Sequence, residues 1–183
     1  DTAKAQELVD GLAQLPRLMG DLLADNSVYQ QAAREYARFN NFLFLGRGMN
    51  SPIASEGALK LKEISYIHAE GYPAGEMKHG PIALIDNAMA IVALAPQDWL
   101  YDKVANNVKE VKARDGQVLA VLTEGDAQLA ADVDHALYIP EAPEHIIPLL
   151  TTVPLQMLAY HIALLRDRDV DQPRNLAKSV TVE

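Results

Sequence analysis

Four short, continuous apolar runs constrain the fold of this chain more than any other feature of its sequence. They read FLFLG at 42–46, AMAIVALAP at 88–96, QVLAVLTE at 117–124 and HALYIP at 135–140. Apolar runs of about four to eight residues without alternation are typical of strands buried on both faces. Helical segments separate the runs, so the order of elements predicts an α/β fold with helices on both faces of a parallel sheet.

Helical periodicity fills the segments around these runs, at 4–39, 51–66, 98–114 and 145–166. The first segment divides into two helices at residues 25–27, which favour a helix cap. The last is mostly apolar and suits either a buried core helix or a dimer face. Between them we expect an extended piece at 67–73 and a loop with a short helix at 74–85. The chain thus divides into N-terminal helices at 1–41, a core at 42–166 and a tail at 167–183.

The composition argues against several classes of function. The 183 residues suit one domain, and they contain no cysteine for a disulfide, a thiolate zinc site or a nucleophile. With 25 acidic and 16 basic residues the net charge is -9, which disfavours nucleic acid and membrane as partners. The five histidines show no metal-ligand spacing, so we expect no metal and no cofactor.

The chain shows no targeting segment in its sequence. The first residues are acidic and have helical periodicity, and no stretch approaches the roughly 18 apolar residues that span a bilayer. The chain begins at Asp1 instead of methionine, and we interpret it as part of a longer polypeptide.

A lysine lies on the inner stripe of the helix predicted at 51–66. At about 100° per residue, Lys60 falls between Ile64 and Ile67 on one arc, with Glu63 beside it. On a solvated face, such an i,i+3 ion pair contributes roughly a few tenths of a kcal/mol. In a partly buried place, the same carboxylate is suited to moving a proton at a carbon next to a carbonyl. The spacing alone leaves both interpretations open.

Two glycine-containing segments are further candidates. In GEMKHGP, residues 75–81, His79 precedes a short helix whose dipole favours a neutral imidazole that acts as acid or base. A histidine bonded to the loop backbone is the alternative. In GRGMNS, residues 46–51, Ser51 is the expected helix cap, and strand, turn and helix follow in the order that binds phosphate. Glu70 has the spacing of a ribose-binding acid, but a tight turn explains the same glycines.

Three long segments together resemble one family. They read EGALKLKEISYIHAE at 56–70, GEMKHGPIALI at 75–85 and DQPRNLAKSVTVE at 171–183. They are similar to the C-terminal half of the isomerase domain of the glucosamine-6-phosphate synthase family, also called glutamine–fructose-6-phosphate aminotransferase (isomerizing). The resemblance covers essentially residues 42–183. It implies the sugar isomerase (SIS) fold, a three-layer α/β/α sandwich around a five-stranded parallel sheet.

The resemblance also implies roles for particular residues. Lys178 has the position that forms a Schiff base with open-chain fructose 6-phosphate, and Ala177 and Glu63 are with it among the substrate-binding positions. Glu63 matches the base that moves a proton between the first and second carbons of the sugar, assisted by Lys60. His79 matches the histidine that opens the sugar ring, which the family supplies from the adjacent subunit. By composition alone, Lys178 would belong to a frayed terminus.

The implied reaction converts fructose 6-phosphate and ammonia to glucosamine 6-phosphate in a cytoplasmic homodimer. The implied partners are these sugar phosphates, together with the first SIS half and the glutaminase domain of the same full-length chain. This sequence has neither the glutaminase cysteine nor a Ser/Thr-rich phosphate loop, so we expect little or no turnover by these residues alone. Two alternatives stay open: a non-catalytic SIS module that senses phosphosugars, and a dinucleotide-binding domain based on residues 46–51.

Overall fold

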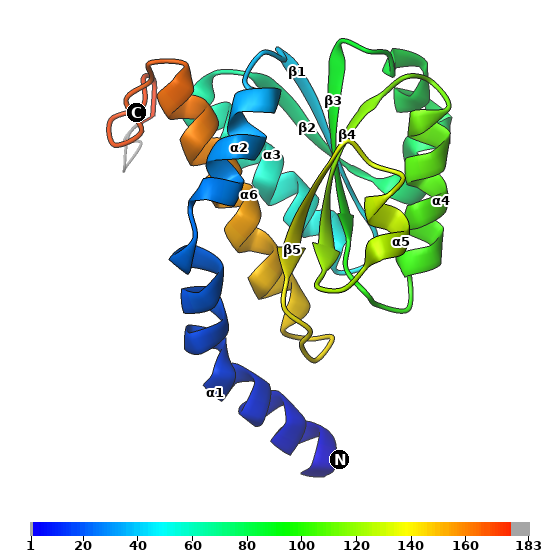
Figure 1. The fold of residues 1–183 in the computed structure, drawn as a ribbon, viewed down its shortest axis with the longest axis vertical. Helices are drawn as coiled ribbons and strands as arrows, with labels where there is room; N and C mark the ends of the chain where they lie inside the picture. Colours follow the sequence, from blue (N-terminus) through cyan, green and yellow to red (C-terminus); the bar gives the residue numbers. More distant parts are fainter. Residues whose placement is uncertain (1, 177–183) are drawn as a thin grey trace, which may run out of the picture.

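The structure, a computed structural model, describes residues 2–176 as a five-stranded sheet between two layers of helices (Figure 1). All strands are parallel, in the order β2-β1-β3-β4-β5. They are β1 (Asn41–Gly46), β2 (His68–Pro73), β3 (Met89–Ala95), β4 (Gln117–Thr123) and β5 (His135–Ile139). The predicted fold class is confirmed, and the extended piece expected at 67–73 is the edge strand β2.

Helices cover both faces of the sheet (Figure 1). One face carries α2 (Ser27–Tyr36), α3 (Asn50–Ser65) and α6 (Ile147–Leu165). The other carries α4 (Tyr101–Lys112), α5 (Ala127–Ala130) and the 3-10 helix η1 (Ala74–His79). A second 3-10 helix, η2 (Pro81–Leu84), follows η1, and the long helix α1 (Thr2–Ala24) precedes α2.

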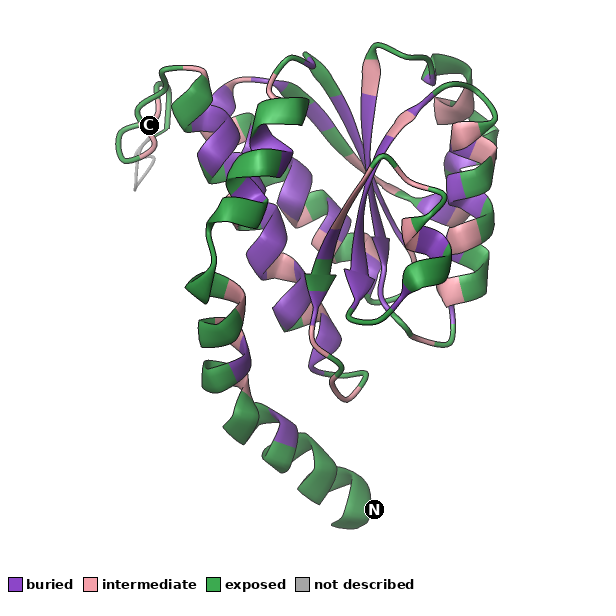
Figure 2. Ribbon diagram, in the orientation of Figure 1, coloured by how far each residue is buried: buried purple, intermediate pink, exposed green. Residues whose placement is uncertain are grey.

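Successive side chains of each central strand enter opposite cores. In β1, Phe42 and Phe44 pack toward α2, α3 and α6, whereas Leu43 and Leu45 pack on the side of α4 and η1. All four side chains are buried, and the central strands are accordingly purple in Figure 2. Because both faces are covered, the sequence of these strands is a continuous apolar run instead of an alternating one.

The start of α3 differs from the prediction that Ser51 caps it. The helix begins at Asn50, because the N–H groups of Asn50 and Ser51 already donate to the carbonyls of Arg47 and Gly48 at 3.0 and 3.2 Å. A backbone turn thus satisfies the first N–H groups, and no hydroxyl is required as a cap. Pro52 lies in the first turn, where its missing N–H removes no helical bond.

The other boundaries follow the sequence with small differences. The break at 25–27 is confirmed, since α1 ends at Ala24 and α2 begins at Ser27. α4 begins at Tyr101 instead of residue 98, because Asp98 Oδ1 accepts the N–H of Leu100 in a preceding turn. The helix expected within 74–85 is two 3-10 turns, and α5 was not predicted, since four residues are too few to show periodicity.

The apolar helix α6 belongs to the core. It packs against α2 and α3, and Leu150, Leu158 and Ile162 are fully buried. Unlike the expectation from the sequence, α6 is long and apolar enough to cross a membrane by length and composition alone, the single such helix within residues 2–176. Of that stretch, 61% is buried inside the fold, which favours the core interpretation over a membrane span.

Candidate active site

The predicted proton-transfer pair lies on α3. Lys60 Nζ is 2.7 Å from Glu63 Oε2 and 3.7 Å from Glu56 Oε1, so one ammonium contacts two carboxylates of its own helix. The side chains of Lys60 and Glu63 are 33% and 28% exposed. The pair is therefore neither fully solvated nor closed off, and a ligand can reach it from outside.

Lys60 lies on the margin of the buried stripe of α3. Gly57 and Leu61 form the centre of that stripe, and a Cβ on Gly57 would meet Leu155 of α6 at 2.7 Å. Ile64 is only partly buried, and Ile67 is buried but lies beyond the end of α3. Lys60 is thus partly buried, as its place between these two isoleucines on the helical arc suggested. The lysine borders the core instead of entering it.

The pair lies at the end of the molecule where the strands begin, which we call the amino edge. Glu63 is near the last residue of α3, about 20 Å along the helix axis from Asn50 at a rise of about 1.5 Å per residue. α3 starts where β1 ends and finishes just before β2 begins. The general rule places ligands at the opposite edge, the carboxyl rim, where parallel strands end. The Lys60–Glu63 pair therefore lies at the end of the sheet opposite to the one that this rule predicts for a ligand site.

The charge on Lys60 is stabilised by its neighbours. The hydrogen bond accepted by Glu63 raises the pKa of the Lys60 ammonium above its usual value, and the charges of Glu63 and Glu56 add to this against the effect of burial. Lys60 is therefore a cation at neutral pH and is not a base. It can orient Glu63 and offer positive charge to an oxygen that becomes negative during a reaction.

His79 lies away from the pair. It ends η1, its side chain is 73% exposed, and its Nε2 is 3.8 Å from Glu76 Oε2. β2 runs from the end of α3 to the start of η1, a length of about 17 Å at about 3.3 Å per residue. The structure thus does not bring His79 to Glu63 within one chain. A histidine from another subunit, as the resemblance implies, is compatible with this separation.

The first part of the tail returns to the end of α3. Arg166 donates to the carbonyls of Ala37 and Phe39 at 2.6–3.0 Å, directly before β1. Farther along, the N–H of Arg174 donates to the hydroxyl of Tyr66 at 2.8 Å. In Figure 1 this segment lies near the end of α6, away from the strand arrowheads. Lys178, together with Ala177, lies outside the described residues.

The GRGMNS segment at the carboxyl rim forms a tight turn. A Cβ on Gly46 would lie 2.0 Å from the carbonyl oxygen of Asn50, and Gly48 has a φ of 55°, so both positions require glycine. Asn50 Nδ2 donates to Asp98 Oδ2 at 3.2 Å, and burial raises the pKa of the Asp98 carboxyl. Glu70 is exposed on the edge strand β2. A close-packed turn beside an acidic residue favours the turn interpretation over a phosphate site.

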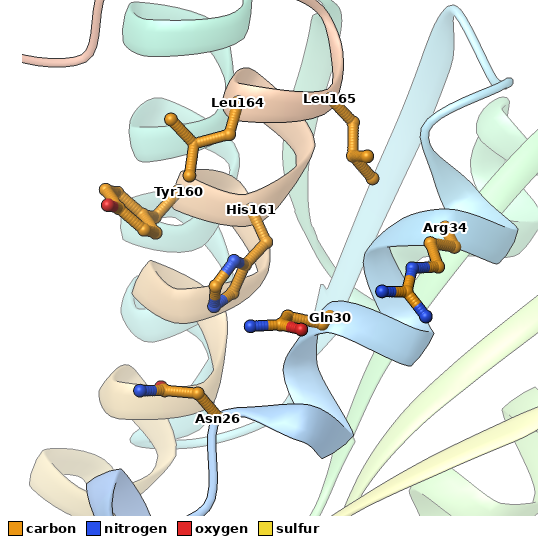
Figure 3. Close-up of a pocket in the computed structure, with 7 residues that line it drawn as sticks. All are labelled: Asn26, Gln30, Arg34, Tyr160, His161, Leu164 and Leu165. Atoms are coloured by element: carbon orange, nitrogen blue, oxygen red, sulfur yellow. The ribbon is translucent and has the colours of Figure 1, made fainter.

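A groove of about 470 Å³ lies between α2 and α6 (Figure 3). Its lining side chains are Asn26, Gln30, Arg34, Tyr160, His161, Leu164 and Leu165. His161 lies between the two helices in Figure 3, and burial lowers the pKa of its imidazole, so it is neutral at pH 7. None of the predicted site residues lines this groove, which therefore does not form part of the candidate site.

Two contacts of the candidate site were not predicted from the sequence. Glu56 is a second carboxylate on Lys60, and its i,i+4 spacing would have identified it. Tyr66 holds the tail against α3, and no local pattern indicates this, because its partner Arg174 is more than a hundred residues away. Contacts over such separations are determined by tertiary structure alone.

Comparison with known proteins gives relatives over the whole chain. The chain is 53% identical over 183 residues to the glutamine–fructose-6-phosphate aminotransferase (isomerizing) of Bacteroides thetaiotaomicron, covering 100% of this chain and 30% of that relative. It is 53% identical over 180 residues to the protein of the same name from Thermus thermophilus, covering 98% and 30%. A solved C-terminal domain of glucosamine-fructose-6-phosphate aminotransferase from Francisella tularensis superposes with a TM-score of 0.87 at 39% identity.

The extent of these matches defines what the chain represents. The chain spans about 30% of the length of the curated relatives. The match to the solved domain includes 94% of this chain and 49% of the solved chain. Residues 35–166 match the family described as SIS domain, which is more than half of the chain. The chain therefore belongs to the SIS domain family.

Proposed function

We propose that this chain is the C-terminal isomerase half of a glutamine–fructose-6-phosphate aminotransferase (isomerizing), and that Lys60 and Glu63 belong to its active site. The observation that carries the proposal is the 2.7 Å Lys60–Glu63 pair, which is partly exposed at the edge to which the tail returns. The relatives that bear this name support it by their identity over the full chain.

The first proposed step joins the sugar to the protein. The amine of Lys178 attacks the second carbon of open-chain fructose 6-phosphate, a carbon–nitrogen bond forms, and the carbonyl oxygen leaves as water. Ammonia then attacks the same carbon, which restores the lysine amine and leaves a sugar imine. In the full-length protein, the ammonia comes from glutamine. His79 of an adjacent subunit opens the sugar ring before these steps.

Glu63 carries out the isomerisation in this proposal. Its carboxylate removes a proton from the first carbon, which the neighbouring imine makes acidic, and the carbon–hydrogen electron pair moves into a carbon–carbon double bond. The electron pair of the carbon–nitrogen double bond moves to the nitrogen, which takes up a proton. The carboxyl group then returns its proton to the second carbon, while the hydroxyl of the first carbon gives up its proton to solvent and becomes a carbonyl, so that the net result is one proton moved from oxygen to nitrogen. The product has an amine at the second carbon and an aldehyde at the first. The Lys60 cation stabilises negative charge on the oxygen during the transfer.

The rest of the site belongs to parts beyond this chain. We propose that the phosphate of the sugar is bound by the first SIS half, because the corresponding turn here is the close-packed GRGMNS segment beside Asp98. The partners in this proposal are the first SIS half and the glutaminase domain, both parts of the same full-length protein, and the ligand is fructose 6-phosphate or its product. A homodimer and a cytoplasmic location remain predictions. The phosphosugar-sensing alternative needs no acid–base pair, so the following experiment also distinguishes the two functions.

The test compares two carboxylates that contact the same lysine. In the full-length protein that contains this chain, Glu63→Gln should reduce exchange of the first-carbon hydrogen of fructose 6-phosphate with D₂O by at least about 100-fold, as expected for loss of a general base. Glu56→Gln, the matched control, should change the exchange rate by less than about threefold. NMR of the sugar measures the exchange, and glutamine hydrolysis should be unaffected in both variants. Equal exchange by both variants would refute the proposed role of Glu63.

A further inference from the structure

A chain of polar contacts joins α4 to η1, the 3-10 helix that ends at His79. Lys78 Nζ of η1 lies 2.6 Å from Glu110 Oε1 of α4. The other carboxylate oxygen of Glu110 accepts the side-chain amide of Asn107 at 3.4 Å. Asn107 Oδ1 in turn accepts from Arg47 Nη1 at 3.5 Å. These four residues, which we call the η1 network, connect η1, one side of α4 and the turn after β1.

Arg47 also packs against the backbone of η1. A Cβ on Gly75 would lie 3.2 Å from the guanidinium carbon of Arg47, so the glycine leaves room for this side chain. Arg47 therefore contacts the first turn of η1, and Glu110 contacts the last turn through Lys78. A short 3-10 helix has few and poorly aligned hydrogen bonds of its own, so contacts at both ends determine its orientation.

Apolar packing holds the remaining side of η1. Ala74 and Met77 are fully buried, in the same core as Val104 and Val108 of α4. His79 is 73% exposed at the end of this helix. The imidazole thus extends outward from a helix that is anchored along its length, and its direction depends on how η1 is held.

The η1 network is better suited to orienting η1 than to stabilising the fold. The Lys78 side chain is largely exposed, and exposed ion pairs add little to stability. Asn107 is buried, and its amide offers a donor on one side and an acceptor on the other, which are not interchangeable. With a carboxylate on the donor and a guanidinium on the acceptor, the amide has one orientation. Asn107 therefore determines where the carboxylate that binds Lys78 lies.

We propose that Glu110 and Asn107 are positioning residues for His79: within the η1 network they hold η1 in the orientation from which the imidazole reaches the sugar. This inference rests on the proposed function, in which His79 opens the ring of fructose 6-phosphate bound by an adjacent subunit. Glu110 and Asn107 contact no reacting atom.

Ring opening makes a strict demand on the position of the imidazole. The hydroxyl on the second carbon loses its proton, the bond between that carbon and the ring oxygen breaks, and the ring oxygen takes up a proton. A group that moves these protons has to come within about 2.6–3.2 Å of the oxygens. A small rotation of η1 would take His79 out of this range without unfolding any element.

The test uses the full-length protein and two sugars. Fructose 6-phosphate is mostly cyclic and has to be opened, whereas its 5-deoxy analogue lacks the hydroxyl that closes the furanose ring and is always open-chain. NMR measures exchange of the first-carbon hydrogen with D₂O for each sugar. A variant that disturbs only His79 should slow the exchange of fructose 6-phosphate alone. A variant that damages the fold or the Lys60–Glu63 pair should slow both.

The two positioning residues should affect one sugar only. We expect Glu110→Ala to lower the exchange rate of fructose 6-phosphate about three- to tenfold and that of the 5-deoxy analogue less than about twofold. Asn107→Leu, which keeps the size of the side chain but not the amide, should act in the same direction. The exchanged pair Lys78→Glu/Glu110→Lys restores the ion pair, and its exchange of fructose 6-phosphate should be faster than that of Glu110→Ala.

Asp132→Ala is the matched control. Asp132 pairs with Lys109 of α4 at 4.0 Å, so this variant removes an ion pair of the same helix that does not involve η1. Exchange of both sugars should stay within about twofold of the wild type. His79→Ala is the reference, and it should lower the exchange of fructose 6-phosphate at least about tenfold while sparing the analogue.

The outcomes separate the positioning role from the proposed function. Equal losses with both sugars in Glu110→Ala would overturn the positioning role, and so would wild-type exchange of fructose 6-phosphate in both Glu110→Ala and Asn107→Leu. Either result leaves the proposed function intact. A His79→Ala variant that treats the two sugars alike would refute ring opening by His79 and this inference with it. Should Asn107→Leu unfold, Glu110→Ala decides the question, since Glu110 lies outside the core.

Discussion

The end of the sheet where its strands begin, the amino edge, and the end where they finish, the carboxyl rim, differ in what they offer a ligand. At the carboxyl rim, Gly46 lies so close to Asn50 that no side chain fits between them, and Asn50 is bonded to a half-buried Asp98. At the amino edge, the Lys60–Glu63 pair is partly exposed, and the tail returns to α3 through Tyr66. Parallel α/β sheets usually bind ligands at the carboxyl rim. In this chain, the groups suited to chemistry lie at the other edge.

If the proposed function holds, this difference explains how one half of a two-part isomerase can act. A half-domain whose own rim is closed by packing cannot supply the phosphate site, but it can present an acid–base pair and a lysine to a sugar held by another half. The amino edge is the end of the molecule from which such a pair projects. Under the proposed function, the rim serves stability and the amino edge serves the reaction. The following predictions test each side of this comparison.

The largest effect on stability is expected at the rim. Gly46→Ala places a Cβ 2.0 Å from the carbonyl oxygen of Asn50, so the turn between β1 and α3 has to move. We expect a loss of about 3 kcal/mol in the free energy of unfolding, measured by denaturant titration. Gly20→Ala in α1 meets nothing within 4 Å and should instead stabilise the protein by about 0.5–1 kcal/mol. Similar free energies of unfolding for the two variants would contradict the close packing of Gly46 against Asn50 at the carboxyl rim.

A smaller loss is expected at the amino edge. Arg166 binds the carbonyls of Ala37 and Phe39 and the side chain of Asn40, which fastens the end of α6 to the start of β1. Arg166→Ala leaves these acceptors without a charged donor, and we expect it to lower the free energy of unfolding by about 2 kcal/mol.

Arg114→Ala is the control for this loss. Arg114 follows the end of α4 and its exposed guanidinium donates to the carbonyl of Glu110 in that helix, so its removal should change the stability by less than about 0.5 kcal/mol. An equally small change in the free energy of unfolding for Arg166→Ala, measured by the same denaturant titration, would mean that the hydrogen bonds of Arg166 do not stabilise the contact between the end of α6 and the start of β1.

The smallest effect is a pH dependence at the rim. Burial raises the pKa of Asp98 in the folded state, so the folded protein holds a proton on this carboxyl to higher pH than the unfolded chain does. Stability associated with this group is therefore present at low pH and decreases as the pH rises from about 3 toward neutrality. Asp98→Asn should remove that decrease, and its Tm relative to the wild type should rise over this range. Asp102→Asn, on the exposed side of α4, should track the wild type, and a parallel course for all three proteins would contradict the assignment.

Much of the fold was predictable because the central strands are buried on both faces. Their continuous apolar runs, together with the helical segments between them, predicted the parallel sheet with helices on both faces. The predicted N-cap of α3 was wrong by two residues, since the helix is capped at Met49 by a backbone turn and not at Ser51. The short α5 was missed because four residues carry no periodic signal.

The candidate site was predictable only where its partners are close in the sequence. The Lys60–Glu63 pair follows from helical spacing, and its bond is present at 2.7 Å. To locate this pair at the amino edge, one has to know the direction in which α3 runs relative to the strands, and the structure provides it. The contact between Tyr66 and Arg174 joins residues 108 positions apart, and only the packed fold brings them together. The roles of Lys178, Ala177 and His79 came from the resemblance and remain predictions.

The most direct test of the account is the identity of the lysine that captures the sugar. The full-length protein is incubated with fructose 6-phosphate, reduced with borohydride and digested, and mass spectrometry locates the modified residue. The account predicts a single reduced adduct on Lys178, formed also in Glu63→Gln, which retains the amine but not the base. An adduct on a lysine of the opposite edge, such as Lys78 of η1, would contradict the assignment of the chemistry to the amino edge.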